Sequence, residues 1–130
     1  MELTKESKIK LRLLSDGVIY NEAVKFIETE GTTTNSQISG LENIAIVAKK
    51  YSEIRNFSQN QAKKGRKLFE SLTKKFDEIH QKTVSEYGVI KESEALTKKE
   101  LNEQKDNYSL LVIREFIHHL SAHHRYKQER

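Results

Sequence analysis

The sequence predicts an all-α protein: a single-domain bundle of four to six helices around a C-terminal core helix. Three observations lead to this prediction. The chain has no Pro and five Gly in 130 residues, so it lacks the regular turn chemistry of a sheet protein. Lys, Glu and Leu are abundant, and all three favour helices. The longest apolar run, residues 110–113, lies inside a stretch that opens with a helix start signal.

The first expected element is helical and covers about residues 4–28. A Ser-Asp-Gly triplet at residues 15–17 interrupts it. Because Gly costs roughly 1 kcal/mol inside a helix and Asp prefers caps, one bent helix and two short helices both remain open. We treat residues 1–30 as an N-terminal segment and residues 31–130 as the bundle, within one domain. The main apolar face of the N-terminal segment would hold Ile9, Leu13, Tyr20, Val24 and Ile27.

Two further helices are expected in the middle of the chain. Thr34 paired with Gln37, or Ser36, would cap a helix that runs to about Ile54. A short connection at Asn56 and Ser58 would follow. The next helix, over about residues 59–85, is the most clearly amphipathic. Its apolar face holds Leu68, Phe69, Leu72, Phe76 and Ile79, and the opposite face holds Lys63, Lys67 and Lys74.

The last helix is expected over residues 97–126, after the preceding helix ends at Tyr87-Gly88 and a polar loop follows at residues 89–95. Thr97 and Glu100 have the spacing of a capping box. Apolar side chains cover more than half of this helix, as is typical of the central helix of a bundle. They include Leu110, Val112, Ile113, Phe116, Ile117 and Leu120.

The positive charge of the chain is concentrated in its middle third. The net charge is +4, yet residues 31–75 alone carry nine basic and three acidic side chains. Such a localised excess favours a polyanion partner. A solvated helix face is the plainer interpretation, although such faces usually mix both signs of charge.

Several kinds of chemistry find no support in the sequence. There is no Cys, no Gly-x-Ser-x-Gly elbow, no Walker loop and no dinucleotide-binding glycine motif. His119 and His123 are four residues apart and share a helix face, so a metal site is one interpretation. Partly buried packing histidines are the more ordinary one, and we predict neither a metal nor a cofactor.

The spacing of Arg114 and His119 resembles the Arg-x4-6-His motif of HEPN ribonucleases, small helical domains that act on RNA. In a continuous helix these two side chains point about 140° apart. A HEPN-like ribonuclease or toxin that uses Arg114 and His119 is therefore the alternative hypothesis, and it requires the helix to break between them.

Three sequence features resemble the small helical subunit of type III-A CRISPR effector complexes. The segment TTTNSQI, residues 32–38, is similar to the entry of that family's first long helix. QAKKGRKLF, residues 61–69, is similar to its basic Ala-Gly-Arg segment. LSAHHRYKQ, residues 120–128, is similar to its Ala-Tyr-x-x-Tyr segment, with His123 and Tyr126 in the aromatic places. The order and spacing agree over about residues 31–130, although Lys63-Lys64 replace the Ala before Gly-Arg.

The resemblance implies a non-catalytic, RNA-binding structural subunit for antiviral defence. It implies guide RNA, target RNA, larger CRISPR backbone subunits and stacked copies of the chain as partners. Carried over by position, Arg66 is the best match for an RNA-contacting residue. We expect no membrane partner and a cytoplasmic location, since no long apolar run or signal-peptide core is present. The expected phosphate contacts are Lys49, Lys50, Arg55, Lys63, Lys64, Arg66, Lys67 and Lys74.

Overall fold

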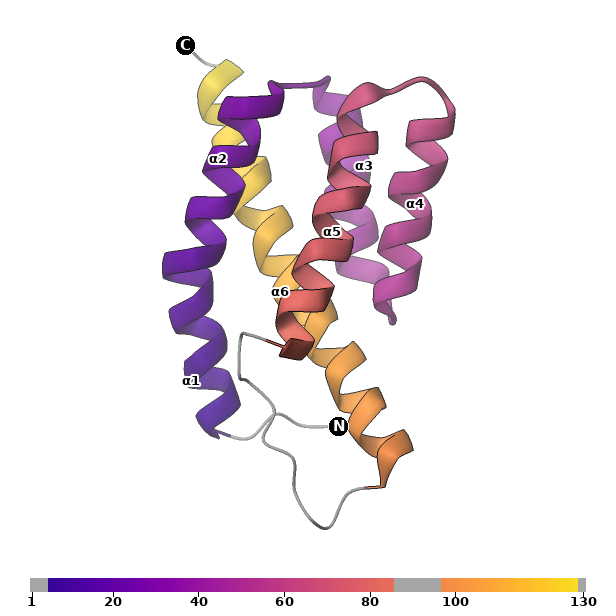
Figure 1. Cartoon of the computed structure of the whole chain (residues 1–130). Coiled ribbons are helices and arrows are strands. Elements are labelled where there is room, and N and C mark those ends of the chain that lie inside the picture. Colours follow the sequence, from indigo (N-terminus) through magenta and orange to yellow (C-terminus); the bar gives the residue numbers. More distant parts are fainter. Residues whose placement is uncertain (1–4, 86–96, 129–130) are drawn as a thin grey trace.

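A computed structural model describes residues 5–85 and 97–128 and confirms the all-α prediction. The described residues form six α-helices and one π-helical turn, without a strand (Figure 1). The predicted helix end at Tyr87-Gly88 and the predicted loop at residues 89–95 lie outside the described residues. The elements are α1 (Lys5–Leu14), η1 (Ser15–Ile19), α2 (Tyr20–Glu30), α3 (Asn35–Val47), α4 (Tyr51–Lys63), α5 (Lys67–Ser85) and α6 (Lys98–Gln128).

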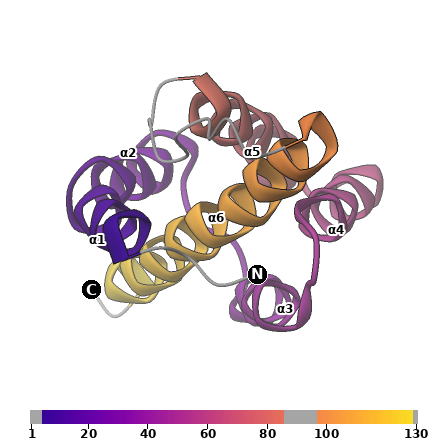
Figure 2. The ribbon, with the colours of Figure 1, turned by 90° about the horizontal axis from the view of Figure 1, so that it is seen from below.

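Helix α6 is the centre of the bundle, as the sequence predicts. It crosses the middle of the molecule with the other helices placed around it (Figure 2). Val112, Phe116 and Leu120 are fully buried along its length. Its start is also as expected, because the Glu100 N–H donates a hydrogen bond to Thr97 Oγ1 at 3.1 Å. This bond satisfies one of the free N–H groups at a helix N-terminus.

The N-terminal segment is one continuous helical run, α1–η1–α2, and the Ser-Asp-Gly triplet lies in its π turn. Ser15, Ile19, Ala23 and Ile27 are buried, one at every fourth position. In an α-helix each step of four overshoots a turn by about 40°, so such a row would rotate away from α6. A π turn uses more residues per turn and offsets this drift.

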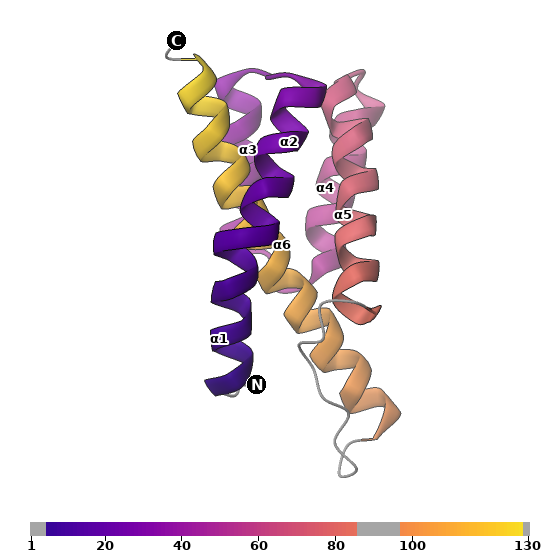
Figure 3. The same ribbon diagram turned by 60° about the vertical axis from the view of Figure 1, so that its left-hand side comes forward.

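The predicted apolar face of this segment is therefore only partly correct. Ile27 is buried, but Ile9, Leu13 and Tyr20 are 51%, 68% and 47% exposed. The wheel assumed a uniform α-helical rotation, which the π turn breaks. Figure 3 shows α1 and the first turns of α6 diverging at one end of the bundle.

The boundary between the second and third predicted helices is wrong. Thr34 does cap α3, since its Oγ1 accepts a hydrogen bond from the Gln37 N–H at 3.2 Å. However, α3 ends at Val47, and a new helix begins at Tyr51. The predicted connection at Asn56 and Ser58 lies inside that helix, α4.

Polar side chains of α4 fix the turn before it and its contact with α5. Glu53, in the first turn of α4, accepts hydrogen bonds from the N–H groups of Lys49 and Lys50 at 2.5 and 3.0 Å. Ser58 is fully buried, and its hydroxyl lies 2.7 Å from that of Thr73 on α5. Ser58 therefore joins two helices rather than starting one.

The C-terminal end of α6 fixes the connection between α2 and α3. His124 is fully buried, and its Nε2 lies 3.1 Å from Thr33 N and 2.9 Å from Thr33 O. Gln128 donates a further hydrogen bond to Thr33 O at 2.9 Å. The turn between α2 and α3 is thus anchored to the central helix.

Candidate nucleic-acid interface

Six of the eight predicted phosphate contacts fall into two groups at opposite ends of α4. Lys49 and Lys50 lie in the turn before α4, whereas four cations lie in and beside the turn after it (Figure 1). At a rise of 1.5 Å per residue, thirteen helical residues place the two turns roughly 20 Å apart. We call the second group, Lys63, Lys64, Arg66 and Lys67, the α4–α5 basic corner.

Gly65 creates this corner and corrects the predicted helix over residues 59–85. Its φ angle is +84°, a left-handed conformation that favours glycine. The Gly65 N–H donates to Ala62 O at 3.0 Å, and the Arg66 N–H donates to Gln61 O at 3.4 Å. These bonds form a Schellman motif that ends α4. A lone Gly beside two lysines is the signal that the sequence offered for this helix end.

The helical wheel assumed that Lys63, Lys67 and Lys74 share one helix. In the structure, Lys63 ends α4, and Lys67 and Lys74 lie on α5. The apolar side of the prediction is confirmed, since Phe69, Leu72 and Phe76 are fully buried in α5. The basic surface is thus a turn between two helices. It is not a stripe along one helix.

The four cations of the corner lie within five consecutive residues, and no carboxylate among the described residues pairs with them. Lys63, Lys64 and Lys67 are exposed, and Arg66 is half-buried and donates a hydrogen bond to the Gln61 side chain. None of the four forms an ion pair with a carboxylate in residues 5–85 and 97–128. Their charge is therefore available to an external anion.

Arg55, another predicted phosphate contact, is held by Asp77 of α5. Its Nε lies 2.7 Å from Asp77 Oδ1 and its Nη2 3.2 Å from Oδ2, while Tyr51 donates to the same carboxylate at 2.5 Å. Burial raises the pKa of Asp77, but the hydrogen bonds from Arg55 and Tyr51 outweigh burial and lower it below its usual 3.8. This bidentate pair already neutralises Arg55.

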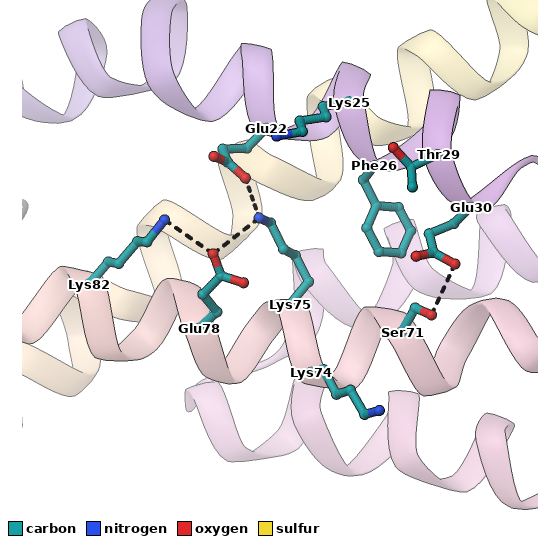
Figure 4. A pocket seen from close by; sticks show the side chains of 10 residues that line it. All are labelled: Glu22, Lys25, Phe26, Thr29, Glu30, Ser71, Lys74, Lys75, Glu78 and Lys82. Atoms are coloured by element: carbon teal, nitrogen blue, oxygen red, sulfur yellow. Dashed lines mark hydrogen bonds and ion pairs between the residues drawn. The ribbon is translucent and has the colours of Figure 1, made fainter.

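The remaining predicted contacts are exposed. Lys49 and Lys50 donate hydrogen bonds from their backbone N–H groups to the Glu53 side chain. Both lysines are exposed to solvent. The hydrogen bonds from these N–H groups also lower the pKa of Glu53. Lys74 lies on α5 beyond the corner and lines a groove between α2 and α5 (Figure 4).

Arg114 and His119 contact different parts of the bundle. Arg114 donates hydrogen bonds to Ala45 O and Ala48 O at the end of α3, at 2.6 and 2.5 Å. His119 Nε2 lies 2.9 Å from Ser15 Oγ in the π turn. Figure 2 shows α1 and α2 on the opposite side of α6 from α3. Helix α6 is continuous through this region. The break that would bring the two side chains together is not there.

His119 and His123, the two histidines that a metal site would use, also have separate partners. His123 Nε2 lies 2.9 Å from Glu28 Oε1, and its ring stacks against Tyr126 with centroids 5.8 Å apart. Over residues 5–85 and 97–128, no three His, Cys, Asp or Glu side chains are arranged to hold a metal ion.

The groove between α2 and α5 holds lysines that the sequence analysis did not group with Lys74. Lys25 comes from α2, and Lys75 and Lys82 come from α5. Lys75 forms an ion pair with Glu22 across the groove and lies 3.4 Å from Glu78 (Figure 4). Only the packing of α2 and α5 against the same central helix brings these residues together, and no sequence spacing predicts that.

Comparison with known proteins gives this chain no relative: no family model, curated protein or solved structure matches it. In the part of the chain that the structure describes, no helix combines the length and apolar character that a bilayer crossing requires.

Proposed function

We propose that this chain is a non-catalytic RNA-binding structural subunit that holds RNA phosphates at the α4–α5 basic corner. The observation that carries the proposal is four cations within residues 63–67, at a hydrogen-bonded turn, without an acidic partner among the described residues. Lys49 and Lys50, roughly 20 Å away by the length of α4, would form a second contact to the same strand.

The positions of the corner cations relative to the helix dipoles favour an anion-binding role over a purely solubilising one. Lys63 lies in the last turn of α4, where a cation favours the helix dipole. Arg66 and Lys67 lie at the start of α5, where cations oppose the dipole. Glu70, also in the first turn of α5, offsets part of this cost. Positive charge at a position that costs helix stability is better explained by an anionic partner.

The kind of contact also fits a subunit that accepts any RNA sequence. Lysine ammonium groups bind phosphate as point charges and read no bases. Such contacts give affinity that falls steeply with salt. In contrast, Arg55 is committed to Asp77, so we leave it out of the proposed surface.

The finer proposal is a small subunit of a type III-A CRISPR effector complex. It is supported by the order and spacing of the three sequence segments and by the place of Gly65-Arg66 in the basic corner. Purification of the tagged chain from its native cells tests it. Large backbone subunits, guide RNA and several copies of the chain should copurify. Recovery of the chain without RNA would contradict this assignment.

Salt-dependent binding to single-stranded RNA tests the broader proposal. Affinity for a labelled oligonucleotide is measured by fluorescence anisotropy over a salt series, for the wild type and for K63A/K64A/K67A. With about 0.7 units of logarithmic slope per phosphate contact, loss of three contacts should flatten the salt dependence by roughly 2.

A matched control separates the corner from net charge. The triple variant K8A/K98A/K99A removes the same charge from exposed positions on α1 and α6. It should bind RNA nearly as well as the wild type. Equal weakening by both triple variants, or no RNA binding by the wild type, would overturn the proposal.

A further inference from the structure

Three uncharged polar side chains, Ser52, Asn56 and Asn60, follow one another along the outer face of α4. All three are exposed. They are four residues apart, so they lie on one side of the helix. The opposite side packs into the bundle through Ile54 and Ser58, which are fully buried. Figure 2 shows α4 at the edge of the bundle, so this polar face is open to solvent.

The polar face of α4 connects the two groups of predicted phosphate contacts. Lys49 and Lys50 lie in the turn before α4, and Lys63 ends the helix at the basic corner (Figure 1). From Ser52 to Lys63 the helix rises roughly 16 Å. A strand that contacts both turns by the shortest path therefore passes along this face.

The polar face of α4 differs in composition from the solvated face of the next helix. On α5 the exposed positions alternate in charge, at Lys67, Glu70, Lys74 and Glu78. On α4 no carboxylate occurs between residues 54 and 63. Glu53, at the start of α4, already accepts two backbone N–H groups. Because Asn is a poorer helix former than Lys, Glu or Ala, the exposed asparagines are not explained by the stability of α4.

The amide groups of these asparagines keep their full hydrogen-bonding capacity. Neither Asn56 nor Asn60 makes a side-chain hydrogen bond to another described residue. In contrast, Arg55, Ser58 and Gln61 of the same helix all have side-chain partners. Each amide offers N–H donors and a carbonyl acceptor. A ribose 2′-hydroxyl both donates and accepts, so it matches an amide in both roles.

The basic turns alone cannot distinguish RNA from DNA. Lysine side chains bind phosphates as point charges, and both nucleic acids carry the same phosphates. The 2′-hydroxyl is the group by which a protein tells them apart. Contacts to this hydroxyl do not depend on the base, so they suit a subunit that accepts any RNA sequence.

We infer that Asn56 and Asn60 bind ribose 2′-hydroxyl groups of an RNA strand that runs along α4 between the two basic turns. The two asparagines thereby select RNA over DNA. This inference rests on the proposed RNA-binding function and adds a sugar-recognition site to it.

The first test compares three single strands of one sequence: RNA, DNA, and RNA in which fluorine replaces each 2′-hydroxyl. Fluorine keeps the sugar conformation of RNA but cannot donate a hydrogen bond. Two hydrogen bonds between neutral groups are worth about tenfold in affinity. The wild type should therefore bind the RNA about tenfold more tightly than either analogue. Equal binding of all three strands would overturn the inference.

The variant N56A/N60A should lose this preference. It should bind RNA about as weakly as the wild type binds DNA, with an unchanged salt dependence because no charge is removed. Alanine favours an exposed helix, so thermal melting should show a folded protein. The matched control N102A/N107A replaces two exposed asparagines of α6 and should keep the preference. A preference that survives N56A/N60A, or that N102A/N107A abolishes, would contradict the assignment.

Two readouts separate failure of the sugar-recognition site from failure of the proposed function. K63A/K64A/K67A should weaken RNA and DNA binding equally, so the salt dependence flattens while the ratio of the two affinities is kept. N56A/N60A should change the ratio and keep the salt dependence. A wild type that binds RNA and DNA equally well, with a steep salt dependence, contradicts the asparagine site alone. A wild type that binds neither strand contradicts both proposals.

Discussion

The Arg114 guanidinium group donates a hydrogen bond from Nε to the carbonyl oxygen of Ala45, 2.6 Å away. Its Nη2 reaches the carbonyl oxygen of Ala48 at 2.5 Å. Arg114 therefore closes the C-terminus of α3, where free carbonyl groups and the negative end of the helix dipole attract a cation. This position makes Arg114 a structural link between the central helix and its neighbour.

Replacement of Arg114 should destabilise the fold. R114A removes two charge-assisted hydrogen bonds, and we expect a loss of about 2 kcal/mol in the free energy of unfolding. R114K should recover part of this, because one ammonium group cannot match the planar fork of a guanidinium. Urea unfolding measures both variants. R125A, which removes an exposed pair with Glu42, is the control and should cost less.

The same variant tests the ribonuclease hypothesis. If Arg114 and His119 acted on RNA, purified wild type would cleave an oligonucleotide, and R114A or H119A would stop the cleavage. From the separate partners of the two side chains, we expect intact RNA after long incubation. Cleavage by the wild type that R114A abolishes, with the fold intact, would contradict this expectation.

Gly65 should be intolerant of a side chain for conformational reasons alone. A Cβ added there meets no atom within 4 Å, but the φ angle of +84° is strained for any other residue. We expect G65A to cost about 1 kcal/mol by thermal or urea unfolding. Gly17 provides the matched control, since it also has open space but no positive φ angle. G17A should be neutral or stabilise the chain by up to about 1 kcal/mol.

Asp77 should make the fold sensitive to acid. Its folded pKa is lowered below 3.8, so its carboxylate stabilises the folded state above the pKa of the unfolded chain. That contribution disappears as the pH falls through the folded pKa, below about pH 4. D77N should be less stable than the wild type at pH 7, and the difference should shrink toward pH 3. The urea midpoint at each pH measures it, and a constant difference would contradict the assignment.

The division of the basic residues predicts additive effects on RNA binding. K49A/K50A and K63A/K64A remove contacts from opposite ends of α4, so they share no partner and should act independently. Each pair should flatten the salt dependence of single-strand binding by roughly 1.4 in logarithmic slope, and the quadruple variant by about twice that. A short oligonucleotide that cannot span both turns should respond to one pair only.

The outcome for Arg55 shows where charge counting along the sequence stops being informative. Arg55 belongs to the basic third of the chain, yet its partner Asp77 lies 22 residues away in the next helix. By contrast, Lys63 and Lys64 keep free side chains because they lie at a turn that Gly65 bends outward. Equal charges on neighbouring positions therefore have different roles, according to what packs beside them.

The sequence by itself determined the helical class, the central place of α6, the Thr97 and Thr34 caps, and the region that carries the excess positive charge. These features depend on composition, on apolar periodicity and on bonds between residues three or four positions apart. The helix end at Gly65 was equally local and was missed, because two lysines and an amphipathic pattern continued across it.

Only the tertiary structure decided the partners of the polar side chains. Arg114 binds Ala45 across 69 residues, and His119 meets Ser15 across 104. It also decided that Lys25 and Lys74 line one groove, since α2 and α5 both pack on Phe116. Such contacts depend on how helices are arranged around a shared core, and nothing in the spacing along a single helix specifies that arrangement.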